Sequence, residues 1–299
     1  MSNVVITDSG LGGLSVVAPL VEKIGNSSLH PHKIIFVNAL PDTHHGYNTM
    51  PDTETKINMF NRVLYGIEKQ FKPDMIAIAC NTLSAIADRT SFARSHDRKL
   101  MNIIDLAIRY GRQRVFDLTG IHNKYVVFAT ETTIDNHSYE QRLKTIGVAS
   151  SDIISVPCPG LASQIELNYR STDTDSLVKK CVSKASQNLH SVKKPVYVIL
   201  GCTHYGYVAD LFTAEFNRLG INNTIFVNPN HYMVEEICQR LSINPAKQTE
   251  QRKGLVSVHI YSRCKILPEE ITSVSKLIEP ISKQTADALR NYELRPNLF

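Results

Sequence analysis

The sequence predicts an α/β protein built from two similar domains with parallel sheets, related by pseudo-symmetry. Short β-branched runs alternate with longer segments whose apolar residues recur at helical spacing, as in residues 57–71, which is typical of parallel sheets flanked by helices. The strand-like runs are apolar with little alternation, which indicates burial on both faces. A cysteine motif also follows two of these runs, at Cys80 and Cys202, which suggests one copy in each domain.

The expected strands span residues 4–7, 33–40, 75–79, 125–129, 153–156, 196–200, 224–227 and 255–261. A more polar stretch near residues 105–123 is expected to cross between the domains, and the helices after Pro268 are expected to return to the first one. The predicted first domain comprises residues 1–110 plus 215–299, and the second comprises residues 111–214.

Composition excludes several classes of protein. The chain has 299 residues, 42% of them hydrophobic and 20% charged, with a net charge of +5. No apolar run approaches the roughly 18 residues that span a membrane, and the N-terminus lacks the basic start of a signal peptide, so a cytoplasmic protein is expected. The lysines and arginines are dispersed rather than clustered, which does not favour nucleic-acid binding.

The six cysteines include no CxxC pair and no zinc-ligand spacing. In a chain of this size, reduced thiols are expected, and no metal site is predicted. A special cysteine would therefore be special through its reactivity. The cysteines outside the two repeated motifs are interpreted as small packing residues: Cys158, Cys181, Cys238 and Cys264.

The first expected strand ends in the glycine-rich segment Asp8-Ser9-Gly10-Leu11-Gly12-Gly13-Leu14-Ser15. Backbone N–H groups of such a turn can bind an anion at the start of a helix. The segment matches neither nucleotide-binding glycine motif, and taken alone it is equally consistent with a structural turn. The carboxylate of Asp8 at a strand end is poorly suited to a core position, which favours a site.

Cys80-Asn81-Thr82 directly follows its strand. A cysteine at a helix N-terminus faces the positive end of the helix dipole, which predicts a lowered thiol pKa. A buried structural cysteine ahead of an N-cap is the alternative. Cys202-Thr203-His204 repeats the arrangement and adds a histidine that can hold or relay a proton. Two such thiols on opposite faces of a planar carbanion would remove and return an α-proton.

The glycine turn is one of four segments that together resemble a known protein family. The other three are Cys80-Asn81-Thr82-Leu83-Ser84-Ala85, Cys158-Pro159-Gly160-Leu161 with Glu166, and Leu200-Gly201-Cys202-Thr203-His204-Tyr205. A further segment, Ala129-Thr130-Glu131-Thr132-Thr133 followed by Tyr139, matches the start of a second domain. From about residue 4 to about residue 228, the chain resembles the glutamate racemase family of the aspartate/glutamate racemase superfamily.

The resemblance implies a two-domain racemase, with the active site in the cleft between the domains, that interconverts L- and D-glutamate and supplies D-glutamate for peptidoglycan. It implies no cofactor, and it leads us to expect a homodimer. It implies Cys80 and Cys202 as the acid/base thiols. Asp8 would support Cys80, and His204, tuned by Glu166, would support Cys202. The residues that would hold the amino acid are Asp8, Ser9, Gly46, Tyr47, Asn81, Thr82, Thr203 and His204.

One segment departs from the family. Where glutamate racemases carry Pro-Tyr-Gly, this chain has Asp42-Thr43-His44-His45-Gly46-Tyr47-Asn48-Thr49. Backbone N–H groups of Gly46 and Tyr47 could still bind a side-chain carboxylate, and the two histidines belong either to the pocket or to a solvated loop. Aspartate or another amino acid is therefore an alternative substrate. A lyase or isomerase of the same superfamily and a ligand-binding protein without turnover are alternative functions.

Overall fold

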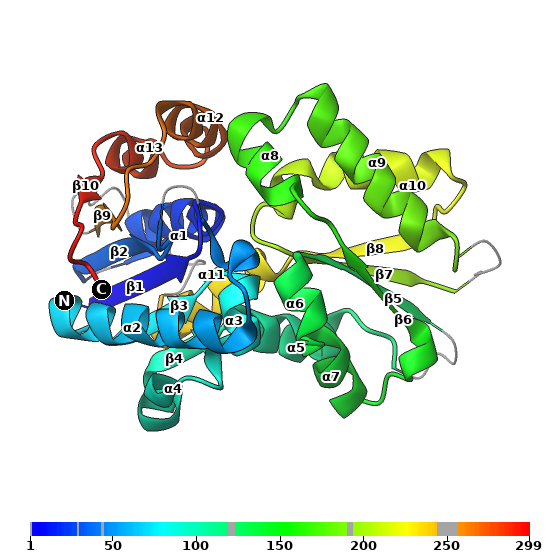
Figure 1. Cartoon of the computed structure of the whole chain (residues 1–299), viewed down its shortest axis with the longest axis horizontal. Helices are drawn as coiled ribbons and strands as arrows, with labels where there is room; N and C mark the ends of the chain where they lie inside the picture. The colour runs from blue at the N-terminus through cyan, green and yellow to red at the C-terminus, as the bar shows by residue number, and fades with distance from the viewer. Residues whose placement is uncertain (1, 29, 43–44, 119–122, 190–193, 244–255) are drawn as a thin grey trace.

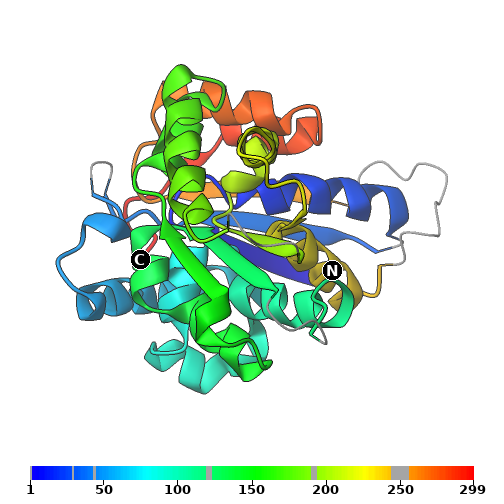
Figure 2. The ribbon, with the colours of Figure 1, turned by 90° about the vertical axis from the view of Figure 1, so that its right-hand side faces the viewer.

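The computed structural model describes residues 2–28, 30–42, 45–118, 123–189, 194–243 and 256–299. Within these residues the strands form two sheets, and every strand pairing is parallel. The first sheet has the order β10-β9-β2-β1-β3-β4 and the second has the order β6-β5-β7-β8. Figure 1 shows the two sheets side by side, each flanked by helices, and Figure 2 looks onto the second one. The predicted fold class is confirmed.

The strands of the first sheet are β1 (Ser2–Asp8), β2 (His32–Asn38), β3 (Met75–Ile78), β4 (Leu100–Asn102), β9 (Val256–Ser262) and β10 (Glu293–Leu294). Those of the second sheet are β5 (Lys124–Ala129), β6 (Ile153–Pro157), β7 (Val196–Gly201) and β8 (Thr224–Val227). The short strands β4 and β10 were not predicted from the sequence. Position 255 of the last expected strand lies outside the described residues.

The helices that lie among or follow the strands of the first sheet are α1 (Leu14–Ser27), α2 (Thr53–Phe71), α3 (Asn81–Ala87), α4 (Ser91–His96), α5 (Ile103–Arg114), α11 (Pro229–Arg240), α12 (Pro268–Ile278) and α13 (Lys283–Arg290). Those that lie among the strands of the second sheet are α6 (Glu131–Asp135), α7 (Ser138–Thr145), α8 (Leu161–Asn168), α9 (Thr172–Ser186) and α10 (Ala209–Arg218). Short 3-10 turns are η1 (Tyr47–Thr49), η2 (Asp97–Lys99), η3 (Ser150–Asp152) and η4 (Tyr205–Val208). In these described residues no helix has the length and apolar character that a bilayer span requires.

Strand order reveals the pseudo-symmetry of the two halves. Four consecutive strands at one side of the first sheet run β2-β1-β3-β4, and the second sheet runs β6-β5-β7-β8. β1, β2, β3 and β4 therefore correspond to β5, β6, β7 and β8. Cys80 follows β3 after one residue, and Cys202 directly follows its counterpart β7. Because ligands of open parallel sheets bind beyond the carboxyl ends of the strands, this topology brings both cysteines to binding edges.

The pairing of β8 bears on the predicted domain boundary near residue 214. The residues of β8, which that boundary assigns to the first domain, pair with β7 of the second sheet. Parallel pairing requires a crossover helix, and α10 supplies it before the strand returns. We therefore propose that the second domain extends to about residue 228, after which α11 packs against α1 and α5 of the first domain.

Alternating residues of the central strands are buried on opposite faces of the first sheet. Val5 and Ile35 face a cluster with α2 and α3, whereas Val4 and Ile34 face a cluster with α1 and α13. The second of these clusters continues through α5 and α11 to the second sheet, so the two domains share apolar packing. The opposite face of the second sheet is covered by α8, α9 and α10. A shared core holds the strand ends of both domains in a defined relation.

Candidate active site

A cavity of about 390 Å³ opens between the carboxyl ends of the two sheets. Residues of both domains line it. All of the site residues expected from the sequence lie in its wall: Asp8, Ser9, Gly46, Tyr47, Cys80, Asn81, Thr82, Glu166, Cys202, Thr203 and His204. His44 lies outside the described residues. The structure therefore brings together side chains that are up to 196 positions apart in the sequence.

The sequence did not point to every wall residue. Thr130 lies in the wall because β5 is the counterpart of β1. Thr130 directly follows the end of β5, and Asp8 is the last residue of β1. Its hydroxyl lies 2.8 Å from the hydroxyl of Thr82. Recognising the repeat of the first strand would have found this residue. Glu270, at the start of α12, also lines the cavity, and no local pattern placed it there.

Cys80 is the N-cap of α3, and its sulfur accepts a hydrogen bond from the backbone N–H of Leu83 at 3.4 Å. The hydroxyl of Ser9 lies 3.0 Å from the same sulfur and 3.5 Å from Oδ1 of Asp8. Carboxylate, hydroxyl and thiol thus form a chain of polar groups that begins at the end of β1. Such a chain can hold or pass a proton at the thiol.

The surroundings of Cys202 differ in detail. A 3-10 turn rather than an α-helix follows this cysteine, because the chain bends at η4 before α10 begins. Cys202 Sγ lies 3.5 Å from Nδ1 of His204, and Nε2 of His204 lies 2.7 Å from Oε1 of Glu166. Glu166 therefore fixes the ring of His204 and leaves its other nitrogen facing the thiol.

Each of these arrangements is completed by the opposite domain. Thr203 of the second domain donates its hydroxyl hydrogen to Oδ2 of Asp8 at 2.8 Å. In return, the backbone N–H of Leu11 donates to Oε1 of Glu166 at 2.7 Å. All four residues lie close to the glycine turn, where the two domains touch. The polar contacts around both thiols are therefore complete only when the domains are in this relative position.

The glycine turn permits that contact. A Cβ atom on Gly12 would lie 2.2 Å from Oγ1 of Thr203 and 2.4 Å from Cε1 of His204. No real Cβ atom approaches another heavy atom so closely. Gly12 is therefore required by the close approach of the second domain at this turn.

Burial dominates the electrostatics around Cys80. Burial, together with the nearby Asp8 carboxylate, raises the pKa of the Cys80 thiol well above its usual value, although hydrogen bonds from Ser9 and Leu83 oppose the shift. Burial also raises the pKa of Asp8. The prediction that the helix N-terminus lowers the pKa of Cys80 is wrong, because desolvation and a neighbouring carboxylate both disfavour the thiolate.

The second side of the cavity carries an ion pair. Burial alone would lower the pKa of His204, but the Glu166 carboxylate and Cys202 raise that pKa well above its usual value. Burial opposes ionisation of Glu166, yet His204 lowers the carboxyl pKa overall. An imidazolium and a carboxylate are therefore the favoured forms. Within the described residues, no three His, Cys, Asp or Glu side chains are arranged to hold a metal ion.

Comparison with known proteins finds sequence similarity to glutamate racemases. No protein-family model matches the sequence. The chain is 26% identical over 244 residues to glutamate racemase 3 of Caldanaerobacter subterraneus, which covers 80% of each chain. It is 26% identical over 255 residues to a glutamate racemase of Clostridium perfringens, which covers 84% of this chain and 87% of that one.

Solved structures share the fold. The structure matches the glutamate racemase of Francisella tularensis, solved with D-glutamate, with a TM-score of 0.71 and 20% identity over 93% of this chain and 94% of that one. It matches a glutamate racemase isoform of Bacillus anthracis with a TM-score of 0.67 and 19% identity over 98% and 95% of the two chains. The resemblance expected from the motifs is thus confirmed by whole-chain similarity.

Proposed function

Because this chain is a relative of the glutamate racemases, we propose that it is an amino-acid racemase that uses Cys80 and Cys202 as its acid and base. One observation carries the proposal. Two free thiols line a single cavity between the domains, each after an equivalent strand. Ser9, next to Asp8, lies beside Cys80, and His204, paired with Glu166, lies beside Cys202. A hydrolase would need one thiol only, and the second would then have no role.

The reaction moves one proton across a planar intermediate. One sulfur, as thiolate, takes the α-proton of the bound amino acid, and the electron pair of the broken C–H bond is delocalised into the α-carboxylate. The other sulfur, as thiol, then gives its proton to the opposite face of the carbon. The two sulfurs have exchanged protonation states at the end of one turnover, so a second proton transfer must restore them.

The surroundings of the two sulfurs support a division of labour in the resting protein. Its raised pKa keeps Cys80 protonated, so this thiol is suited to donate a proton. His204 lies within reach of Cys202 and is favoured as an imidazolium, which can stabilise negative charge nearby or exchange a proton with the sulfur. A single positioned acid or base contributes about 10²- to 10⁴-fold in rate.

Most of the hydrogen-bond donors that the cavity wall offers to the amino acid are neutral. No lysine or arginine lies among the described residues that line it, and the imidazolium of His204 is already paired with Glu166. Substrate carboxylates are therefore held mainly by backbone N–H groups and by side chains such as Ser9, Asn81 and Thr82. Fixing the substrate in this way orients the C–H bond between the sulfurs. Gly46 and Tyr47 lie in the wall where the family's Pro-Tyr-Gly segment is expected, and we propose that they face the substrate side chain.

Glutamate is the first substrate to test, because both curated relatives carry its name and the Francisella tularensis structure contains D-glutamate. Aspartate is the second. If glutamate is the substrate, the product D-glutamate would serve peptidoglycan synthesis. We further propose a cytoplasmic location, since both thiols must stay reduced to act, and a homodimer, which light scattering of the purified protein would test.

Incubation of the purified protein with single L-amino acids in D₂O tests the function. We expect incorporation of α-deuterium and loss of optical rotation with glutamate. Cys80→Ser and Cys202→Ser should each abolish racemisation, while Cys238→Ser should retain it, because Cys238 is buried in α11 and does not line the cavity. Absence of exchange across a panel of amino acids would refute the proposal.

A further inference from the structure

The two ends of the Asn81 side chain have different surroundings. Its oxygen Oδ1 accepts a hydrogen bond from the hydroxyl of Tyr139 at 2.7 Å. Its nitrogen Nδ2 is buried and has no hydrogen-bond partner among the described residues, although Asn81 lines the cavity. A buried donor without a partner destabilises a protein, and such a group in the wall of a site indicates a ligand that satisfies it.

Tyr139 reaches Asn81 from the other domain. It belongs to α7 of the second domain, whereas Asn81 begins α3 of the first, directly after Cys80. Tyr139 is 2% exposed, and burial raises the pKa of its hydroxyl, which therefore keeps its proton. A phenol has one proton to donate, and here it is donated to Oδ1. The amide is thereby held with its NH₂ group as the end left for a ligand.

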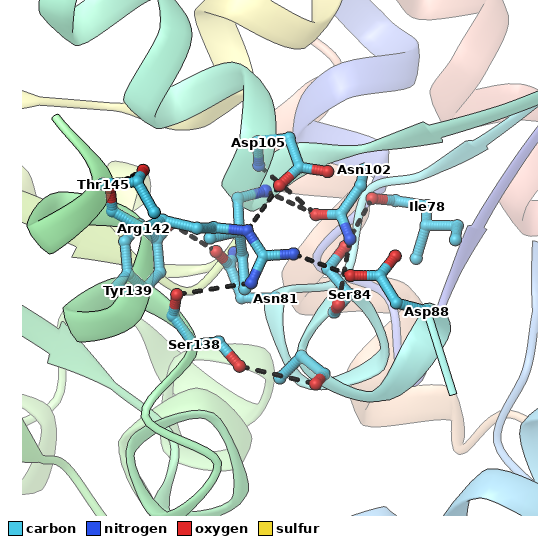
Figure 3. A network of polar contacts seen from close by, with 12 residues as sticks. Ile78, Asn81, Ser84, Asp88, Asn102, Asp105, Ser138, Tyr139, Arg142 and Thr145 are labelled. Atoms are coloured by element: carbon cyan, nitrogen blue, oxygen red, sulfur yellow. Dashed lines mark hydrogen bonds and ion pairs between the residues drawn. The ribbon is translucent and has the colours of Figure 1, made fainter. Parts of the chain in front are cut away.

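Further contacts hold α7 along α3, as Figure 3 shows. Near the middle of α3, Ser138 donates to the backbone oxygen of Ala85 at 3.4 Å. One turn further along α7, Arg142 donates to the carboxylate of Asp88, the C-cap residue of α3, at 3.0 Å. Successive contacts at matching helical spacing fix the position of α3 relative to the second domain.

The same arginine also contacts a third helix, α5. Arg142 also pairs with Asp105 in the first turn of α5. Both of its acidic partners are more than half exposed, so these ion pairs contribute little to stability. Their geometry nevertheless keeps Tyr139, which lies less than one turn away on α7, opposite the start of α3. The alignment of α7 thus acts on the orientation of the Asn81 amide.

We propose that Tyr139 is a positioning residue that orients the carboxamide of Asn81 so that Nδ2 donates to a carboxylate of the amino-acid substrate beside Cys80. The inference rests on the proposed racemase function and adds a role for the second domain on the first domain's side of the site. Without the hydroxyl of Tyr139, the amide can rotate and present its oxygen to the carboxylate, which repels it.

Steady-state racemisation by the full chain tests the role. Tyr139→Phe keeps the ring and removes only the hydroxyl. We expect KM to rise about three- to tenfold, the range that one lost hydrogen bond predicts, with a smaller change in kcat. Tyr125→Phe is the matched control, because this buried tyrosine of β5 lies outside the cavity wall, and it should leave KM unchanged.

A double-mutant cycle distinguishes positioning from a structural role. If Tyr139 acts through the amide, Tyr139→Phe should have no further effect on KM in an Asn81→Ala background. The same factor in both backgrounds, or a KM for Tyr139→Phe equal to that of Tyr125→Phe, would overturn the inference while leaving the racemase function in place. A wild-type protein that exchanges no α-proton would overturn both.

A second variant tests the direction of the amide without changing Tyr139. Asn81→Asp still accepts the hydroxyl of Tyr139 but replaces the NH₂ group by a carboxylate oxygen. We expect KM, or the dissociation constant of glutamate from calorimetry where turnover is too slow, to exceed that of Asn81→Ala by about tenfold or more, because like charges then face each other. Equal values for the two variants would show that Nδ2 does not face the substrate.

Discussion

Substitution of Gly12 by alanine tests whether the close contact between the domains is needed for the chemistry. The added Cβ would lie 2.2 Å from Oγ1 of Thr203 and 2.4 Å from Cε1 of His204, whereas ordinary contact begins at 3.4 Å. The second domain must therefore retreat by about 1 Å from the glycine turn. Both neighbours are held in place, Thr203 by Asp8 and His204 by Glu166, so the movement is transmitted to the groups that serve the thiols.

A misplacement of about 1 Å in an active site can lower the rate about 100-fold. We therefore expect Gly12→Ala to reduce kcat/KM for racemisation by about two orders of magnitude, measured from the change in optical rotation. Gly25→Ala is the matched control. Gly25 lies in α1 with no atom within 4 Å of its added Cβ, and alanine in a helix is favoured over glycine by about 0.5–1 kcal/mol.

The comparison separates catalysis from folding. We expect Gly25→Ala to keep full activity with an unchanged or slightly raised Tm. Gly12→Ala should fold with a lowered Tm and lose activity, because the clash lies between domains and outside either core. If Gly12→Ala is as active as Gly25→Ala, the reasoning is refuted, and the domain contact described here is not the arrangement in which the chemistry takes place.

Three further predictions concern the groups around the thiols. The ion pair of His204 and Glu166 should stabilise the fold most between about pH 4.3 and 6.5, the pKa values of the two groups in the unfolded chain. The pKa of Glu166 is lowered by folding, so its contribution is complete above its unfolded pKa and is lost as pH falls. The pKa of His204 is raised by folding, so its contribution is complete below its unfolded pKa and is lost as pH rises. The difference in unfolding free energy between wild type and Glu166→Gln, measured by urea titration, should peak in that window, and a difference independent of pH would contradict the pairing. Glu166→Gln should also move the alkaline limb of the kcat profile to lower pH if His204 acts as an imidazolium, since its pKa then falls; an unmoved limb would exclude that role. Thr203→Val removes the donor to Oδ2 of Asp8 and should raise the pKa of that carboxyl further. The acidic limb of the kcat profile should therefore shift to higher pH, and an unchanged acidic limb would contradict the prediction.

Much of the architecture was predictable because its signals are local. The alternation of apolar runs and helical spacing reports the secondary structure of each segment by itself, and uniformly apolar strands report burial on two faces. The recurrence of a strand followed by Cys80 and by Cys202 indicated two domains of one design, which the equivalent strand orders of the two sheets bear out. Very short strands such as β10 carry too few residues for a pattern.

The domain boundary shows where local patterns stop being informative. β8 has the composition of a buried strand wherever it pairs, so the sequence alone could not assign it to the second sheet. The choice depends on which sheet edge lies within reach of the chain after α10. Glu270 is a similar case, because α12 packs against α8 of the other domain and Glu270 at its start lines the cavity.

By itself the sequence predicted the fold class and singled out Cys80 and Cys202 with the residue types around them, because each of these signals depends on neighbours within a few positions. Only the tertiary structure decided how those groups act on one another. The contacts Asp8–Thr203, Glu166–Leu11 and Tyr139–Asn81 join opposite domains, and the raised pKa of Cys80 results from its burial beside Asp8. Hydrogen bonds and desolvation depend on distances in space, and separations along the chain carry no record of them.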